Sequence, residues 1–357
     1  MRFNILYVLL SVVLTSTPLS INAQSKAWAA YSNGVLTFSY GSKPVAPSQV
    51  TCSGCGKQMP KTANYCSSCG TKLDNSFVVY EVLAIKTEWD FYERPWSNIV
   101  EAIKKVIFNP SFKQYYPTNL ASFFMHMKNL EQIVGIEYLN TSKAISMDNM
   151  FDGCEHLKSI DLSHFNTTNV TDMSGMFSGC RLVNSLNLST FDTKKVTNMS
   201  HMFECLDNLE SLNISSFNTS SVTTMLCMFR YCPQLKALDV SHFDTRNVKE
   251  FGSMFESCKR ITSLNVSNFN TSKGTYFNGM FQWCNNLTTL DVSSFDTTNA
   301  TNMLCMFYEC TQLRTLYVSA TKWKTDIRRP SDPRDNYGPF YWYGSTKYDF
   351  YANIIKK

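Results

Sequence analysis

The stretch Leu186-Asn-Leu-Ser-Thr-Phe-Asp-Thr-Lys-Lys-Val-Thr-Asn-Met-Ser-His-Met-Phe203 decides the fold of this chain, because its pattern recurs every 26 residues. The period holds without slipping from about Tyr138 to Val318. Its clearest mark is a Met-Phe pair, found at Met150-Phe151, Met176-Phe177, Met202-Phe203, Met228-Phe229, Met254-Phe255, Met280-Phe281 and Met306-Phe307. A fixed period of this size predicts a solenoid, in which each unit buries its apolar face only against its neighbours.

Each repeat contains two apolar patterns of different period. Leu186 and Leu188 alternate with polar residues, as in a strand with one buried face. After a polar turn, four apolar residues follow the spacing of a short helix: Val196, Met199, Met202 and Phe203. Thr197 is the expected N-cap of that helix. The sequence therefore predicts an α/β fold, a leucine-rich-repeat solenoid with a parallel sheet and one short helix per repeat.

The quoted stretch closely resembles the repeat of the BspA-like leucine-rich-repeat surface proteins of bacteria. The resemblance covers about half of the 357 residues and extends more weakly to Ala30–Phe38 and Ile107–Phe112. It implies a parallel-sheet solenoid and a role at the cell surface, often adhesion or the binding of host proteins. It does not name a partner.

The two ends of the chain differ from the repeats. Residues 1–23 are predicted to be a secretory signal peptide, with Arg2 as the positive start, an apolar run from Ile5 to Leu14 and cleavage after Ala23. The alternative is a signal anchor, for which the apolar run is too short. Residues 24–130 are then a small N-terminal domain, 131–320 the solenoid and 321–357 a C-terminal cap. We expect a secreted or cell-surface bacterial protein with no transmembrane span after cleavage.

Four cysteines interrupt the N-terminal domain within an insert at residues 50–74. Cys52, Cys55, Cys66 and Cys69 form two Cys-x-x-Cys pairs, each followed by glycine. This spacing is typical of a zinc ribbon, in which two turns present four thiolates to one structural zinc ion. The alternative is one or two disulfides, since exported proteins often oxidise paired cysteines. A site of four thiolates leaves no open coordination position, so we do not expect a catalytic metal.

The remaining cysteines and the histidines give weaker signals. Six cysteines share one register of the repeat, namely Cys154, Cys180, Cys232, Cys258, Cys284 and Cys310. We predict a column of small, buried, unreactive thiols, with disulfides between neighbouring repeats as the alternative. The five histidines are scattered and are predicted to lie on surface turns.

The function is predicted from the outward positions of the strands, because no catalytic motif appears. We expect protein contacts at Ser159, Asp161, Ser185, Asn187, Ser211, Asn213, Asp239, Ser263, Asn265, Thr289 and Asp291. The recurring Asp and Asn residues are read as a solvated polar ladder in preference to a calcium site. The net charge of +5 is thinly spread, which disfavours nucleic acid as a partner. The prediction is therefore an exported adhesion or interaction protein that binds other proteins or extracellular matrix. A structural spacer of the cell envelope is the alternative, and an enzyme a remote one.

Overall fold

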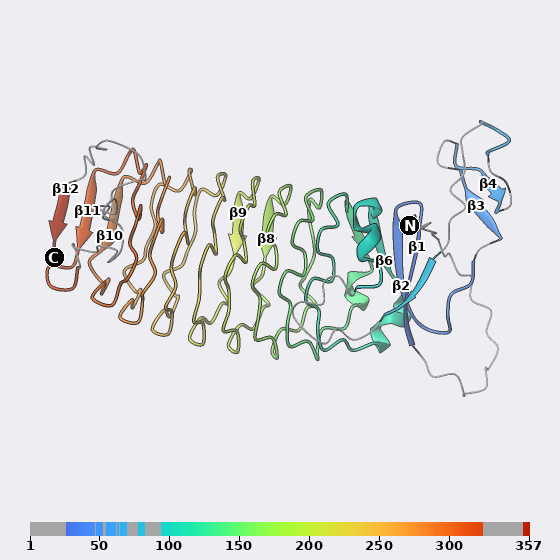
Figure 1. Cartoon of the computed structure of the whole chain (residues 1–357), viewed down its shortest axis with the longest axis horizontal. Coiled ribbons are helices and arrows are strands. Elements are labelled where there is room, and N and C mark those ends of the chain that lie inside the picture. The colour runs from blue at the N-terminus through green and yellow to red at the C-terminus, as the bar shows by residue number, and fades with distance from the viewer. Residues whose placement is uncertain are drawn as a thin grey trace, which may run out of the picture.

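The computed structural model describes residues 26–46, 48–52, 55–61, 63, 65–69, 78–82, 94–323 and 353–357. Figure 1 shows an elongated stack in which each repeat forms one rung, with the N-terminal sheet at one end and the C-terminal strands at the other. The predicted signal peptide, residues 1–23, lies outside the described residues.

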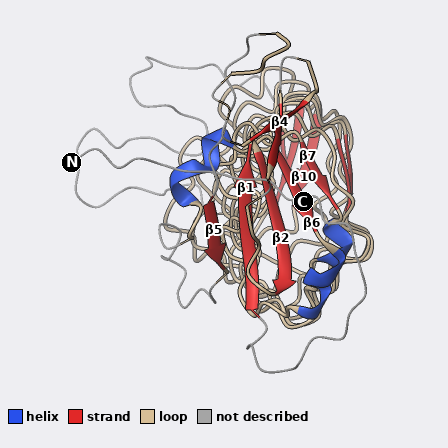
Figure 2. Ribbon diagram, turned by 90° about the vertical axis from the view of Figure 1, so that its right-hand side faces the viewer, coloured by secondary structure: helices blue, strands red, loops and turns tan. Residues whose placement is uncertain are grey.

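The N-terminal end is a mixed sheet of five strands in the order β5-β1-β2-β6-β7. The strands are β1 (Lys26–Ser32), β2 (Val35–Gly41), β5 (Val78–Glu81), β6 (Lys105–Phe108) and β7 (Gln132–Val134). Strand β1 runs antiparallel to β2 and β5, whereas β2, β6 and β7 are parallel. Among the described residues, three short 3-10 helices accompany these strands: η2 (Ser97–Ala102), η3 (Pro110–Gln114) and η4 (Ile136–Tyr138). Figure 2 shows this sheet covering the end of the stack, which shields the first rung from solvent.

The predicted strand of the repeat is present in several rungs. Strands β8 (Ser185–Asn187) and β9 (Ser211–Asn213) pair in parallel, as do β10 (Thr289–Val292), β11 (Thr315–Val318) and β12 (Asn353–Lys356). The inward column is aligned as expected, with Leu186 opposite Leu212 and Leu290 opposite Leu316. Strand β12 belongs to the predicted cap, and it extends the sheet by one more parallel strand. Residues 324–352 of that cap lie outside the described residues.

The predicted helix of each repeat is wrong. Among the described residues, the Met-Phe segments are successive turns and none is an α-helix. The amides of Met199, His201 and Phe203 donate to carbonyls of the next rung, at 3.2, 2.8 and 2.9 Å, where a helix would bond within itself. Isolated parallel bridges continue this second ladder from Asn119 to Asn302. The stack thus begins before residue 131. An apolar pattern of eight residues, such as Val196 to Phe203, could not distinguish a helix from these turns.

Left-handed backbone explains how the turns direct their amides toward the next rung. Two positions of every repeat have φ between 51° and 69°. The first left-handed column is Asn149, Gly175, His201, Cys227, Ser253, Gly279 and Cys305; the second is Gly153, Gly179, Cys205, Tyr231, Ser257, Trp283 and Glu309. A left-handed residue breaks the helical path and costs a non-glycine residue roughly 1–2 kcal/mol. Contacts between rungs offset that cost, because most members of both columns are not glycine.

One hydrophobic core runs through the N-terminal sheet and the solenoid, from Ala27 to Val318. Its most regular part is a column of parallel aromatic rings: Phe124, Phe151, Phe177, Phe203, Phe229, Phe255, Phe281 and Phe307. Their centroids lie 5.0–5.9 Å apart, with interplanar angles of 1–11°. Trp323 continues the column at 6.2 Å from Phe307. The strict spacing of the Met-Phe pairs therefore encodes ring stacking along the whole rod.

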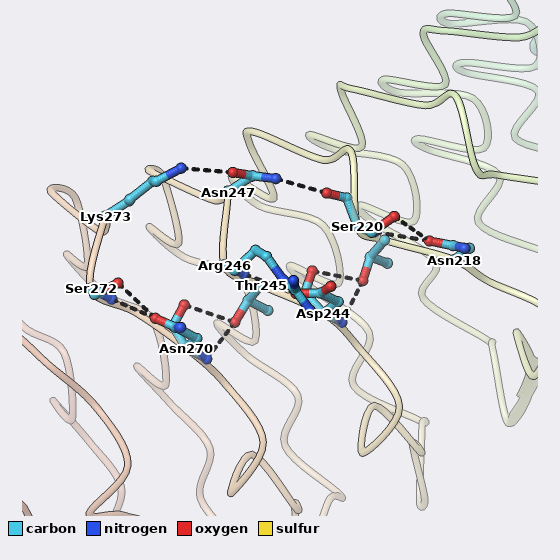
Figure 3. A network of polar contacts seen from close by, with 10 residues as sticks. Asn218, Ser220, Asp244, Thr245, Arg246, Asn247, Asn270, Ser272 and Lys273 are labelled. Carbon is cyan, nitrogen blue, oxygen red and sulfur yellow. Dashed lines mark hydrogen bonds and ion pairs between the residues drawn. The ribbon is translucent and has the colours of Figure 1, made fainter.

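A buried threonine ladder holds neighbouring rungs together. Its members are Thr141, Thr167, Thr193, Thr219, Thr245, Thr271 and Thr297, none more than 3% exposed. The Thr219 hydroxyl donates to the carbonyl of Asp244 at 3.0 Å and accepts the amide of the same residue at 2.8 Å. Figure 3 shows the next such pair of hydrogen bonds, between Thr245 and Asn270. The polar turn of the repeat thus connects neighbouring rungs, because its threonine hydroxyl bonds backbone groups that would otherwise lack a partner.

Candidate metal centre and binding face

The first pair of the four cysteines lies on a small hairpin made of β3 (Gln49–Thr51) and β4 (Gln58–Pro60). Its turn is closed by two backbone bonds: the amide of Cys52 donates to Lys57 at 2.9 Å, and the amide of Gly56 donates to Cys52 at 2.8 Å. Gly56 has φ +74°, so a residue without a side chain is favoured there. The hairpin lies beyond the N-terminal sheet, away from the solenoid (Figure 1).

The structure brings all four predicted ligands together. Cys52 Sγ lies 3.5 Å from Cys69 Sγ, and Cys55 Sγ lies 3.6 Å from Cys66 Sγ. All four sulfurs lie within 4.8 Å of one another. Tetrahedral zinc with Zn–S bonds of about 2.3 Å requires sulfur separations of about 3.8 Å. The four cysteines can therefore hold one metal ion without rearrangement of the backbone.

The surroundings of the four thiols differ. Cys52 and Cys66 are buried against Val50, and the partly buried Met59 packs on them. Cys55 and Cys69 are exposed. A backbone hydrogen bond from Ser68, whose amide lies 3.4 Å from Cys66 Sγ, lowers the pKa of Cys66. At Cys55 a backbone hydrogen bond at Lys57 also lowers the pKa, but burial and the neighbouring thiols raise it to about 11. One thiol is thus prepared for ionisation by its own turn.

The predicted contact residues of the sheet face share one side of the stack. Ten of them are exposed: Ser159, Asp161, Ser185, Asn187, Ser211, Asn213, Asp239, Ser263, Asn265 and Thr289. Asp291 is half-buried, and its carboxylate binds Lys357 at 2.7 Å. These positions alternate with buried residues, as in β8, where Leu186 lies between exposed Ser185 and Asn187. The structure therefore gathers them into two parallel rows, one of Ser and Thr and one of Asp and Asn.

The Asp and Asn row has a local task. The side-chain oxygen of each member accepts the amide of the serine two residues later, at 2.9 Å from Asp161 to Ser163 and from Asp239 to Ser241. The same bond recurs at Asn187, Asn213, Asn265 and Asp291. A backbone hydrogen bond from Ser163 lowers the pKa of Asp161, and a side-chain bond from Ser241 lowers that of Asp239. These residues close the turn that follows each strand.

The cysteines of the repeat register lie in one buried column, as predicted. Cys154, Cys180, Cys232, Cys258, Cys284 and Cys310 are free thiols with at most 7% exposure. Each donates its S–H to a phenylalanine carbonyl of the preceding rung, for example Cys232 to Phe203 at 3.1 Å. Burial raises the pKa of Cys258 and of Cys310 to about 12. Such thiols are unreactive, because the thiolate is the nucleophile.

Sequence reasoning missed two polar sets. The threonine ladder was treated as an ordinary turn, although threonine recurs at one register in seven successive repeats. His201 was grouped with the scattered histidines, yet it lies beside Glu204 and Cys227. No single repeat shows this second set, because its members come from two neighbouring rungs.

These observations define a solenoid repeat protein with a four-cysteine module at its N-terminal end. The family described as "Mycoplasma protein of unknown function, DUF285" matches residues 111–187, 177–264 and 236–329, which together span more than half of the chain. The chain belongs to this family. No curated protein sequence matches it. None of the helices among the described residues is long and apolar enough to cross a membrane.

Three solved structures are similar to this chain. A leucine-rich repeat protein from Bacteroides ovatus has 15% sequence identity and a TM-score of 0.41, with 84% of this chain and 71% of that chain covered. A leucine-rich repeat protein from Eubacterium ventriosum has 14% identity and a TM-score of 0.29, with 93% and 91% covered. A chain of the Toll–Spatzle complex from Drosophila has 14% identity and a TM-score of 0.32, with 62% and 31% covered.

Proposed function

We propose that this chain is an exported surface protein that binds other proteins through the exposed strand face of its solenoid. The observation that carries the proposal is the exposed row of small side chains from Ser159 to Thr289, in which every position is Ser or Thr except Ala237. Six rungs at roughly 4.8 Å spacing give a face on the order of 25 Å long. A standard protein interface buries about 800 Å² on each partner, which a face of this length can supply.

The Ser and Thr row is the better target for a test, because the Asp and Asn row is needed for the turns. Three arginines placed on it, Ser185→Arg, Ser211→Arg and Ser263→Arg, obstruct the face over four rungs. A matched control adds the same charge elsewhere through Thr168→Arg, Ser272→Arg and Thr298→Arg. This second register already carries Lys194 and Arg246, so arginine is accommodated there.

Binding of both variants to whole cells and to immobilised matrix proteins would be measured by surface plasmon resonance. We expect the face variant to lose about tenfold or more in affinity, since bulky charges prevent close contact. The control variant should bind as the wild type does. Equal binding by the face variant, with unchanged circular dichroism, would show that this face is not the contact surface.

The export step has its own test. Cell fractionation followed by surface proteolysis and N-terminal sequencing should find the mature protein outside the cytoplasm, beginning at about residue 24. A cytoplasmic protein that retains Met1 would contradict export and leave the binding face to be judged on its own data.

We further propose that the four cysteines hold one structural zinc ion. The support is the near-tetrahedral spacing of their sulfurs and a donor set of thiolates alone, which fills every coordination position. The ion would fix the hairpin to the second cysteine pair, because only a small core accompanies them. Metal analysis of the purified protein should find one zinc per chain, lost in a Cys52→Ser/Cys55→Ser variant. A protein that contains no metal and in which these four cysteines give no free thiol would establish disulfides in place of the zinc site.

The alternative function is a spacer of the cell envelope, and one observation favours it. The ring column and the threonine ladder connect every rung to the next, so the rod is stiff along its length. Dense display on the cell surface, together with no affinity in the binding measurements above, would select this function.

A further inference from the structure

Three side chains from neighbouring rungs form a cluster outside the four-cysteine module and the strand face. His201 and Glu204 come from one rung and Cys227 from the next, and their donor atoms all lie within 4.8 Å of one another. His201 Nδ1 lies 2.7 Å from Glu204 Oε2. The His201 side chain is 40% exposed, whereas Cys227 is 8% exposed. The cluster therefore lies just below the surface, with the imidazole between solvent and the thiol.

The backbone explains why the imidazole and the thiol meet. His201 and Cys227 are successive members of the first left-handed column, with φ of 59° and 56°. The amide of His201 donates to the carbonyl of Leu226 at 2.8 Å, which places the two residues at the same height in adjacent rungs. Left-handed backbone turns both side chains to the same side of the stack. Their proximity is thus fixed by the ladder and does not depend on side-chain flexibility.

Charged groups lie around the thiol of Cys227. Hydrogen bonds to Cys227 and Glu204 raise the pKa of His201 to about 10, so the ring is positively charged at neutral pH. Glu204 is in turn held by Arg230, at 2.9 Å between Oε1 and Nη1. Arg230 also binds Glu256 at 3.0 Å. A thiol beside a histidine that is oriented by a third group is the arrangement that activates cysteine as a nucleophile.

A metal ion is the other occupant that these donors suggest, and Arg230 argues against it. The guanidinium already occupies one oxygen of Glu204, and its positive charge also favours an anion at Cys227. A cation bound there would be repelled by the neighbouring guanidinium. The arrangement is therefore better suited to a thiolate than to a bound metal.

The chain contains its own control for this site. Cys305 lies in the same column, with φ 57° and 6% exposure. The residues that correspond to His201, Glu204 and Arg230 are Gly279, Gln282 and Tyr308. Burial raises the pKa of Cys305 to about 11. The two thiols thus share backbone and exposure and differ in their ionisable neighbours.

We propose that Cys227 is a nucleophilic thiolate site that forms mixed disulfides with small disulfide molecules. The thiol loses its proton to solvent, the protonated His201 ring stabilises the thiolate that forms, and Glu204 positions the imidazole. The Cys227 thiolate attacks one sulfur of the disulfide R–S–S–R, so that a bond forms between Cys227 and that sulfur as the original S–S bond breaks. The second half leaves as a thiolate that takes a proton from solvent. Cys227 is oxidised, and the departing half is reduced.

The test uses the full-length protein with glutathione disulfide as the probe. Modification of Cys227 and Cys305 would be followed by peptide mass spectrometry of the native protein. We expect Cys227 to react at least about tenfold faster than Cys305 at neutral pH, because His201 and Arg230 lie beside Cys227 and their counterparts beside Cys305 are Gly279 and Tyr308. Equal rates at the two cysteines would overturn the proposal, and this comparison requires no variant.

The role of His201 is tested by His201→Gln, with Cys227→Ser as the variant that must lose the modification. In His201→Gln we expect the Cys227 rate to fall to that of Cys305 and the midpoint of its pH–rate profile to move upward. The charged and titratable groups that face the pair are Asp152, Glu204, Cys205, Arg230 and Glu256. An unchanged rate and an unchanged midpoint in His201→Gln would refute the role of His201.

Discussion

Thr219→Val removes one hydroxyl from the middle of the threonine ladder while keeping the shape of the side chain. Thr219 is 1% exposed, so its hydroxyl cannot turn to bulk water at this position. The valine leaves the amide and the carbonyl of Asp244 without the bonds of 2.8 and 3.0 Å that they make in the native protein. Because no volume is lost, the variant tests the hydrogen bonds and not the packing.

The expected cost follows from two lost hydrogen bonds and two backbone groups that remain buried. A typical hydrogen bond contributes roughly 0.5–1.5 kcal/mol, and a buried group left without a partner costs roughly 1–3 kcal/mol. We expect Thr219→Val to lower the free energy of unfolding by about 2–4 kcal/mol. Thr219→Ser keeps the hydroxyl and removes one methyl group, which costs about 1 kcal/mol. Stability should therefore fall in the order wild type, serine variant, valine variant.

Apolar burial alone predicts the opposite order, because valine buries more apolar surface than serine. Urea unfolding followed by circular dichroism would rank the three proteins. Since a repeat protein can unfold in parts, hydrogen exchange at the Asp244 amide gives the local measure. That amide should exchange much faster in the valine variant than in the serine variant. A valine variant as stable as the wild type, with a protected Asp244 amide, would refute the structural role of the ladder.

Three other predictions concern single rungs. Ser257 is 1% exposed with φ 61°, and its hydroxyl makes no hydrogen bond, so Ser257→Ala should raise the unfolding midpoint in urea. Ser257→Gly should stabilise by about 1 kcal/mol more, because glycine relieves the left-handed strain; a lower midpoint in the alanine variant would show that the hydroxyl has a partner. Phe229 lies 5.5 and 5.7 Å from the rings on either side, so Phe229→Ala should cost about 3–5 kcal/mol. Phe229→Leu should cost clearly less, because leucine restores most of the buried volume; a leucine variant as unstable as the alanine variant would contradict this. The pKa of His201 is raised from 6.5 to about 10, so its contribution to stability should be complete below about pH 6.5 and decline as pH rises toward 10. Unfolding midpoints that fall equally in wild type and His201→Gln over this pH range would show that the protonation of His201 does not stabilise the fold.

The sequence was sufficient for the architecture because the apolar period is strict. Positions such as Leu186 and Phe203 recur every 26 residues, and a buried column requires nothing more than identical spacing. The sequence was also sufficient to predict that Cys52, Cys55, Cys66 and Cys69 lie together, since paired cysteines at this spacing have few other arrangements.

The helix was predicted wrongly because the spacing of Met199, Met202 and Phe203 fits two backbone conformations, an α-helix and a series of turns. A helix and the observed turns bury the same side chains, and they differ in where the amides point. The signal that separates them is glycine at positions 153, 175, 179 and 279, which is unfavourable in a helix and favourable in left-handed backbone. The cluster of His201 and Cys227 could not be found from one repeat, because its contact is made between rungs.

The two ladders also explain why exposed positions of the repeat are open to a binding role. Backbone amides and carbonyls are satisfied by the next rung, by threonine hydroxyls and by Asp or Asn side chains that close turns. The outward serine row is therefore not needed to hold the stack together, whereas the Asp and Asn row beside it closes the turns. Selection for a partner could change Ser185 or Ser211 without disturbing a rung, but the same change at Asn187 would open a turn. Contact specificity in this chain should accordingly reside in the serine row and at rungs where the regular pattern is broken, such as the one that contains Ala237.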